Sequence, residues 1–228
     1  MKVIFTNTDS APMVGYEPQP AKKVIPEWYK ELESYRSGER KPTGEGQISS
    51  TIKRCMPVFD VVTAGYIIFS FTDIYVSLKN GQHWYEWSTG EPIHFHDVSQ
   101  APTHPLSYGQ NFPKWINPWS IKTPKGYSCL FIPPVHRESC FNIFEGIVDT
   151  DTYTNNVNFP FAMKDPTFEG LIPAGTPIAQ VIPFKRDTWK MEIGGEKEVK
   201  QARETSLLIR RTFFDGYKDK YRQLKEYQ

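Results

Sequence analysis

Residues 172–181 read Ile-Pro-Ala-Gly-Thr-Pro-Ile-Ala-Gln-Val, and this stretch decides the fold that we expect for the chain. Proline restricts φ to about −65° and glycine permits positive φ, so Pro173 and Gly175 predict a tight turn. From Ile178 onward the side chains alternate as they do in a β-strand. This alternation places Gln180 where its carboxamide is able to satisfy backbone groups.

A second informative stretch is 145–153, which reads Glu-Gly-Ile-Val-Asp-Thr-Asp-Thr-Tyr. Two shorter pieces precede it, Thr-Ala-Gly-Tyr at 63–66 and Thr-Pro-Lys-Gly-Tyr at 123–127. With 172–181, the four pieces resemble, in order and spacing, the first four sequence motifs of the dUTPase and dCTP deaminase superfamily. The resemblance spans residues 63–184, about half of the chain.

This resemblance implies a mostly β fold, the dUTPase-like β-clip or distorted barrel. The residue pattern outside the resemblance adds a short N-terminal helix and a C-terminal helical tail. The whole chain also resembles, as a divergent member, a protein family found in phages and bacteria, which implies no function. We expect an N-terminal arm and short helix at 1–50 and a β-clip-like part at 51–193. A long aromatic loop insertion is expected at 82–120 and the helical tail at 194–228, all within one compact domain.

The resemblance also assigns site residues by position. It implies that Asp149 is catalytic and orients or deprotonates the attacking water, and that Tyr153 packs under a deoxyribose and excludes a 2′-hydroxyl. Arg137, Ser139 and Gln180 are the other expected ligand contacts. In the family the pocket forms between subunits of a trimer, so self-association as a homotrimer and a nucleotide ligand follow. Mg²⁺ is expected only if the nucleotide is processed, and no metal site made of protein ligands is expected.

Several positions depart from the family's pattern. The acidic position of the first motif is Ile67, the phosphate-binding turn of the second motif reads His-Arg-Glu-Ser at 136–139, and Asn155 replaces a glycine. No glycine-rich C-terminal arm is evident. A carboxylate from another segment, such as Asp60 or Asp73, is an open replacement for Ile67. The sequence therefore indicates a protein that binds or processes a nucleotide without ordinary dUTPase activity, and it leaves open whether the protein is a nucleotide hydrolase, a deaminase-like enzyme or no enzyme.

Other interpretations stay open. The β-clip also occurs in trimeric phage capsid-decoration proteins, so a non-enzymatic structural or assembly module in a virion is the main alternative. Asp149 and Asp151 would then only shape a turn, a position that Asp favours. His94 and His96, with Asp97 and further histidines at positions 104 and 136, suggest a cupin-like metal site as a third hypothesis, although prolines at 92, 102 and 105 argue for loops there.

Bulk composition excludes some classes. The formal net charge is +1, from 27 basic and 26 acidic residues, so the chain as a whole gives no case for nucleic-acid or membrane binding. Three cysteines are too few for a disulfide framework and favour reduced thiols. No stretch reaches the roughly 20 apolar residues of a membrane span and the N-terminus does not read as a signal peptide. We therefore expect a cytoplasmic protein, in the host cytoplasm if a phage encodes it.

The remaining pattern predicts individual elements. An aromatic run from Trp84 to Trp119 could stack bases or sugars, but a packed core or subunit interface fits better because few basic residues interleave with it.

The expected elements are a strand at 3–6, a helix at 26–35, a polar loop at 37–50, strands at 58–62 and 66–78, a hairpin turn at Asn80-Gly81, an ordered excursion at 90–120, strands at 128–132, 143–148, 178–184 and 187–193, and one or two helices in 196–228 broken near Asp215-Gly216.

Overall fold

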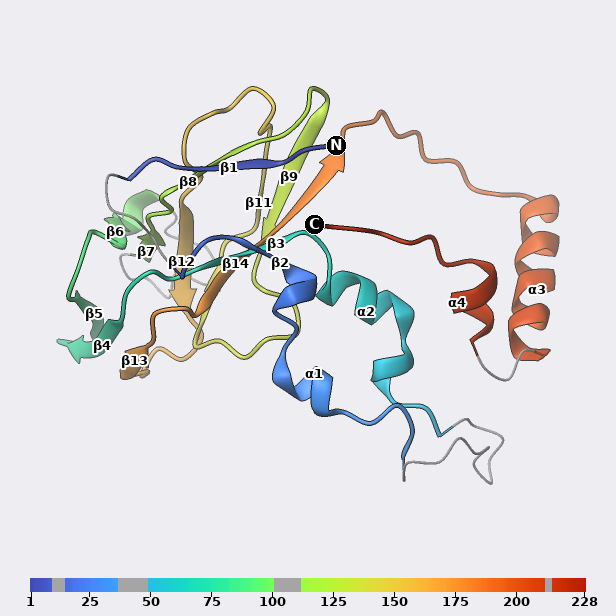
Figure 1. The fold of residues 1–228 in the computed structure, drawn as a ribbon, viewed down its shortest axis with the longest axis horizontal. Coiled ribbons are helices and arrows are strands. Elements are labelled where there is room, and N and C mark those ends of the chain that lie inside the picture. The colour runs from blue at the N-terminus through green and yellow to red at the C-terminus, as the bar shows by residue number, and fades with distance from the viewer. Residues whose placement is uncertain (10–14, 37–48, 101–111, 212–214) are drawn as a thin grey trace. The chain divides into compact units, whose positions relative to one another are not determined.

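The computed structural model describes residues 1–9, 15–36, 49–100, 112–211 and 215–228 (Figure 1). Its contacts group into two compact units. The strand unit comprises Met1–Val24 and Gly65–Arg186, and the helical unit comprises Ile25–Ala64 and Asp187–Gln228. The division into residues 1–50, 51–193 and 194–228 within one domain remains a prediction.

The strand unit carries all the β-strands of the described residues, and every pairing between them is antiparallel. They form four sheets with the strand orders β1-β8, β10-β12-β7-β6, β11-β9-β14-β3-β2 and β13-β4-β5. The mostly β class is thereby confirmed. The strands are β1 (Ile4–Asn7), β2 (Gln19–Pro20), β3 (Tyr66–Phe69), β4 (Ile74–Lys79), β5 (Gln82–Trp87), β6 (Ile93–His96), β7 (Phe112–Trp115), β8 (Trp119–Lys122), β9 (Tyr127–Ile132), β10 (Phe141–Ile143), β11 (Gly146–Val148), β12 (Phe159–Met163), β13 (Gly170–Ile172) and β14 (Pro177–Lys185).

Strand β14 lies in the middle of the largest sheet. It pairs with β9 from Gln180 opposite Ile132 to Lys185 opposite Tyr127, and with β3 on its other side. Gly65, just before β3, has φ of +67°, and a Cβ there would lie 1.9 Å from the carbonyl oxygen of Val181. Only glycine therefore lets this turn approach the backbone of β14.

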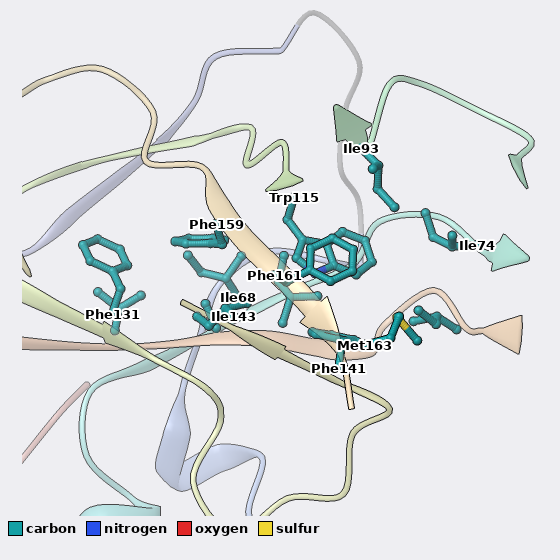
Figure 2. Close-up of a cluster of buried hydrophobic side chains, with 14 of the residues drawn as sticks. Ile68, Ile74, Ile93, Trp115, Phe131, Phe141, Ile143, Phe159, Phe161 and Met163 are labelled. Atoms are coloured by element: carbon teal, nitrogen blue, oxygen red, sulfur yellow. The ribbon is translucent and has the colours of Figure 1, made fainter. Parts of the chain in front are cut away.

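The core of the strand unit is a cluster of aromatic and aliphatic side chains from several sheets (Figure 2). The rings of Trp115 and Phe161 stack with centroids 4.9 Å apart, and Phe141 packs on both of them. The expected aromatic run divides accordingly. Trp115 is buried, whereas Trp84 and Phe95 are about half exposed, at 49% and 50%.

The helical unit contains α1 (Glu27–Glu31), α2 (Met56–Val62), α3 (Glu196–Arg211) and α4 (Gly216–Lys220), with a 3-10 turn η3 at Ile52–Arg54. Asp60 on α2 is buried and accepts hydrogen bonds from Arg222 at 2.7 and 3.0 Å and from Lys225 at 3.0 Å. These bonds lower the pKa of the Asp60 carboxyl and fix the C-terminal residues to α2. None of the described helices is long and apolar enough to cross a membrane.

Several element predictions are confirmed. Asn80 and Gly81 both have positive φ and join β4 to β5 as a hairpin, as the Asn-Gly signal requires. Strands close to 3–6, 128–132 and 178–184 are present, α1 lies inside the expected 26–35, and Asp215 with φ of +60° separates α3 from α4. The loop-like excursion expected at 90–120 contains β6, β7 and the start of β8 in its described part, and residues 101–111 lie outside the described residues, as does most of the polar loop expected at 37–50.

Other element predictions are wrong. Residues 58–62 form the end of α2, because Pro57 opens a helical first turn and Asp60 and Val62 face the inside of the helical unit. Tertiary packing here overrides the β propensity of valine. The expected strand at 187–193 is absent. The expected strands at 66–78 and 143–148 are each two strands, β3 with β4 and β10 with β11.

We predict that Gly65→Ala destabilises the chain by about 3 kcal/mol or more, because positive φ and the clash with Val181 act together. Gly81→Ala is the matched control, since Gly81 also has positive φ but open space around it, and it should cost only about 1–2 kcal/mol. Denaturant unfolding followed by near-UV circular dichroism measures both. Equal costs for the two variants would contradict the close approach at Gly65.

Candidate functional site

The sequence-predicted site residues fall into two groups at opposite ends of the central sheet. Asp149 and Tyr153 follow β11, whose Val148 pairs with Cys129 of β9. Gln180 pairs with Ile132, at the other end of β9, and the loop after β9 carries Arg137 and Ser139. Three residues of strand separate Cys129 from Ile132, which is about 10 Å. The two groups are thus offset along the sheet within one chain.

The second group borders a groove of about 670 Å³, which we call the Arg137 groove. Its cationic side chains are Arg137 and Lys164, and Glu138 adds one negative charge. The full lining is Arg137, Glu138, Ser139, Cys140, Lys164, Ile172, Pro173 and Thr176. The groove therefore combines two cations and two hydroxyls with a small apolar wall.

The charge of Arg137 is not balanced by an ion pair within the described residues. Its side chain is partly buried and donates one hydrogen bond, from Nη2 to the backbone carbonyl of Val24. Within the described part of the chain no carboxylate forms an ion pair with it. Burial lowers the pKa of the Arg137 guanidinium, which nevertheless stays charged, so its desolvation is not offset by a negative partner.

Ser139 and Gln180 mainly organise the backbone of the same loop. The Ser139 hydroxyl donates to the carbonyl of Phe141 at 2.9 Å and accepts from the Phe141 amide at 3.2 Å. Gln180 is 1% exposed, and its Oε1 accepts a hydrogen bond from the Val135 amide at 3.0 Å. The Gln180 carboxamide thus satisfies a backbone amide, as the strand alternation of residues 178–181 predicted. Contact of either side chain with a ligand remains a prediction.

At the opposite end of the sheet, Arg186 binds both aspartates of the 145–153 stretch. Its guanidinium donates to the two carboxylate oxygens of Asp151 at 2.8 and 2.5 Å, and it lies 3.1 Å from Asp149 Oδ1. The Ser128 hydroxyl donates to Asp149 at 2.7 Å. Unlike Arg137, the Arg186 charge is fully compensated. Arg186 was missed by sequence reasoning, because no motif marks the residue after a strand.

The two aspartates have different surroundings. The Asp151 side chain is 3% exposed and also accepts the Gly126 amide at 2.8 Å, whereas the Asp149 side chain is 60% exposed. The hydrogen bond from Arg186 and the one from Gly126 lower the pKa of Asp151 to about 2. Asp151 thus shapes the turn, and Asp149 is the carboxylate that faces solvent. Tyr153 is 45% exposed and its amide donates to the Asp149 carbonyl at 2.8 Å.

The remaining candidate residues have structural partners. Ile67 is fully buried in β3, opposite Gln19 and Gln180, which explains an apolar side chain at this position. Asp73 accepts the Ala174 amide at 2.7 Å. Asp60 is ion-paired with Arg222 and Lys225 within the helical unit. Both Asp60 and Asp73 therefore have structural partners, and neither is shown to replace the acidic residue that the family pattern places at position 67.

The described histidines do not form the cluster that the metal hypothesis requires. His94 Nε2 lies 3.4 Å from Glu91, and the His96 ring bonds to the Gln100 side chain. No group of three or more His, Cys, Asp or Glu side chains placed to hold a metal ion is found in the described ranges, and position 104 lies outside them.

Comparison with known proteins adds a weak likeness. No protein-family model and no curated protein matches the chain. A dUTPase from phage phi11 of Staphylococcus aureus is 15% identical, with a TM-score of 0.32 over 59% of this chain and 85% of that one. A dUTPase from Staphylococcus bacteriophage 80alpha is 16% identical, with a TM-score of 0.30 over 58% and 83%. Likeness at these TM-scores does not establish a shared topology, and the β-clip topology remains a prediction.

We predict that Asp151→Asn lowers the melting temperature by several degrees at pH 7, and that Asp149→Asn, the matched control in the same turn, has a smaller effect. The folded pKa of Asp151, about 2, lies below its ordinary value of 3.8. The carboxylate therefore stabilises the fold above about pH 4, and this contribution is lost as the pH falls toward 2. Melting curves from pH 7 to pH 2 measure this, and equal pH profiles for wild type and Asp151→Asn would refute the role of Asp151.

Proposed function

We propose that the chain binds the phosphate groups of a nucleotide in the Arg137 groove. The observation that carries this proposal is the partly buried Arg137 without a paired carboxylate in the described residues. An arginine fork matches the geometry of phosphate oxygens, and charge-assisted hydrogen bonds are stronger in a partly desolvated site. A bound anion would supply the negative charge that no described carboxylate supplies by an ion pair.

Other groove residues support an anionic ligand. Lys164 is exposed and brings a second positive charge. The Ser139 and Thr176 hydroxyls donate to the carbonyls of Phe141 and Pro173, so each would have to rotate to donate to a phosphate. Glu138 opposes this and weakens the binding of a bare polyphosphate. We therefore propose that the nucleotide binds as its Mg²⁺ complex, in which the metal neutralises part of the phosphate charge.

We further propose that the pocket is completed between copies of the chain. Asp149 and Tyr153 lie toward the other end of the central sheet from Arg137, and a second copy would bring its own Asp149 and Tyr153 beside the groove. In a homotrimer, the copy next to each groove would supply them, with Tyr153 against the sugar. The protein would act in the cytoplasm of the cell that contains it, the host's if a phage encodes it.

Binding without ordinary dUTPase turnover is the activity we propose. Asp149 is exposed and held by Ser128 and Arg186, which keeps it available as a general base. Ile67, however, is locked in the core where the family pattern places an acidic residue. The protein therefore lacks one polar group of a hydrolytic site, and we propose a nucleotide-binding protein rather than a dUTPase.

One observation favours the structural or assembly alternative. Ile147 is 63% exposed on β11, which is an edge strand of the central sheet. Exposed aliphatic side chains on an edge strand favour pairing with another chain. This alternative requires no ligand in the Arg137 groove.

We predict that one member of a panel of deoxynucleotides, ribonucleotides and cyclic nucleotides, with Mg²⁺, raises the melting temperature of the purified chain. Saturation at 100 times the dissociation constant contributes about 2.7 kcal/mol, which is a shift of several degrees. Arg137→Ala should abolish the shift. Lys122→Ala is the matched control, because it removes one exposed positive charge on β8 and should retain the shift.

Pyrophosphate release, measured in the same samples, distinguishes a binder from an enzyme. We expect stabilisation with little or no pyrophosphate. The absence of a shift with any nucleotide at millimolar concentration, or an equal shift in Arg137→Ala, would contradict nucleotide binding in this groove and leave the assembly module as the better account.

A further inference from the structure

One acidic side chain of the Arg137 groove is not explained by binding to phosphate alone. Glu138 follows Arg137 directly, lines the same groove and is exposed. Within the described part of the strand unit its carboxylate forms no hydrogen bond and no ion pair, although the cations Arg137 and Lys164 line the groove with it. The groove therefore presents a carboxylate beside the cations that we assign to phosphate.

The turn that carries this carboxylate is held by the strand unit at both of its ends. At its start, the Val135 amide donates to Gln180 Oε1 at 3.0 Å, and His136 has a positive φ of +54°. A histidine in this left-handed conformation is uncommon and persists where the surrounding structure fixes it. At the end of the turn, the Ser139 hydroxyl bonds to the backbone of Phe141. The backbone of the turn is thus set in the unliganded chain.

The other side-chain oxygens of the groove are engaged within the chain. The hydroxyls of Ser139 and Thr176 donate to the carbonyls of Phe141 and Pro173 at 2.9 and 2.6 Å. Carboxylates are also the protein ligands that Mg²⁺ prefers. Among the lining residues, Glu138 is therefore the side chain best suited to bind a divalent cation.

The groove does not hold enough ligands for such a cation by itself. Mg²⁺ is usually bound by one or two carboxylates together with the phosphate oxygens of a substrate, and it keeps several of its waters. In the described ranges, no three side chains of His, Cys, Asp or Glu gather to hold an ion. The donor set of the groove thus fits Mg²⁺ when a polyphosphate supplies the other oxygen ligands.

We propose that Glu138 is a ligand of the Mg²⁺ ion that enters the groove with the phosphate groups. This inference rests on the proposed binding of phosphate beside Arg137. Arg137 and Lys164 would contact phosphate oxygens, and Glu138 would supply a carboxylate oxygen to the metal. The carboxylate repels the phosphate groups when the metal is absent and attracts the metal when it is present. Removal of its charge should therefore change the affinity in opposite directions under the two conditions.

Calorimetric titration with inorganic tripolyphosphate tests the proposal, because this probe has no base or sugar for Glu138 to contact instead. Wild type and Glu138→Gln are each titrated in saturating Mg²⁺ and in EDTA. We expect Glu138→Gln to bind about tenfold more weakly in Mg²⁺ and about threefold more tightly in EDTA. Glu86→Gln, which removes an exposed charge on β5 outside the groove, is the matched control and should behave as wild type under both conditions.

The outcomes separate this inference from the proposed function. An unchanged or tighter affinity of Glu138→Gln in Mg²⁺ would overturn the role of Glu138, whereas binding that is lost in Arg137→Ala would still support the phosphate site. If wild type does not bind tripolyphosphate at millimolar concentration, or if Arg137→Ala binds it equally well, both proposals are overturned.

The requirement for phosphate gives a second measurement. Because the groove offers the metal one carboxylate, Mg²⁺ alone should leave the melting temperature of wild type unchanged, and tripolyphosphate should raise it more with Mg²⁺ than with EDTA. In Glu138→Gln this difference between Mg²⁺ and EDTA should vanish. A difference as large as that of wild type would show that the metal does not depend on Glu138 and would overturn the proposal.

Discussion

The burial of strand β14 between β9 and β3 is the constraint on which the rest of the strand unit depends. Hydrogen bonds on both of its sides leave no room for a side chain where Gly65 passes over Val181. They also bring Gln180 under the loop after β9, where its carboxamide holds the Val135 amide. At the other end, β14 delivers Arg186 to the acidic turn. One buried strand thereby positions both ends of the candidate site.

The two ends differ in how their charges are balanced. Arg186 is surrounded by Asp149, Asp151 and the Ser128 hydroxyl, so its charge contributes to the stability of the turn and calls for no ligand. Arg137 lies partly buried beside a groove, with one carbonyl as its partner. A desolvated charge without a counter-charge costs free energy in the unliganded chain, and that cost is relieved when an anion binds. Function is therefore expected at the end where the fold leaves charge uncompensated.

Local signals in the sequence predicted part of this structure. Asn80-Gly81 predicted its hairpin because a type I′ turn needs positive φ at both positions. The roles that the motif resemblance assigns to Arg137 and Asp149 remain predictions. The helix at 56–62 was mistaken for a strand, since its valines favour strands and its burial is decided by contacts of Asp60 with Arg222, far away in sequence. Compensation by distant residues, such as Arg186 for Asp151, has no local signal at all. The same limit applies to Arg137, because only the fold shows that none of the described carboxylates pairs with it.

The most direct test of nucleotide binding in the Arg137 groove is a crystal structure of the chain with a non-hydrolysable deoxynucleoside triphosphate and Mg²⁺. The account predicts phosphate oxygens within hydrogen-bond distance of the Arg137 guanidinium, and the Asp149–Tyr153 turn of a neighbouring copy beside the sugar. A nucleotide bound elsewhere, or an empty groove in which Arg137 pairs with a carboxylate of another copy, would contradict it.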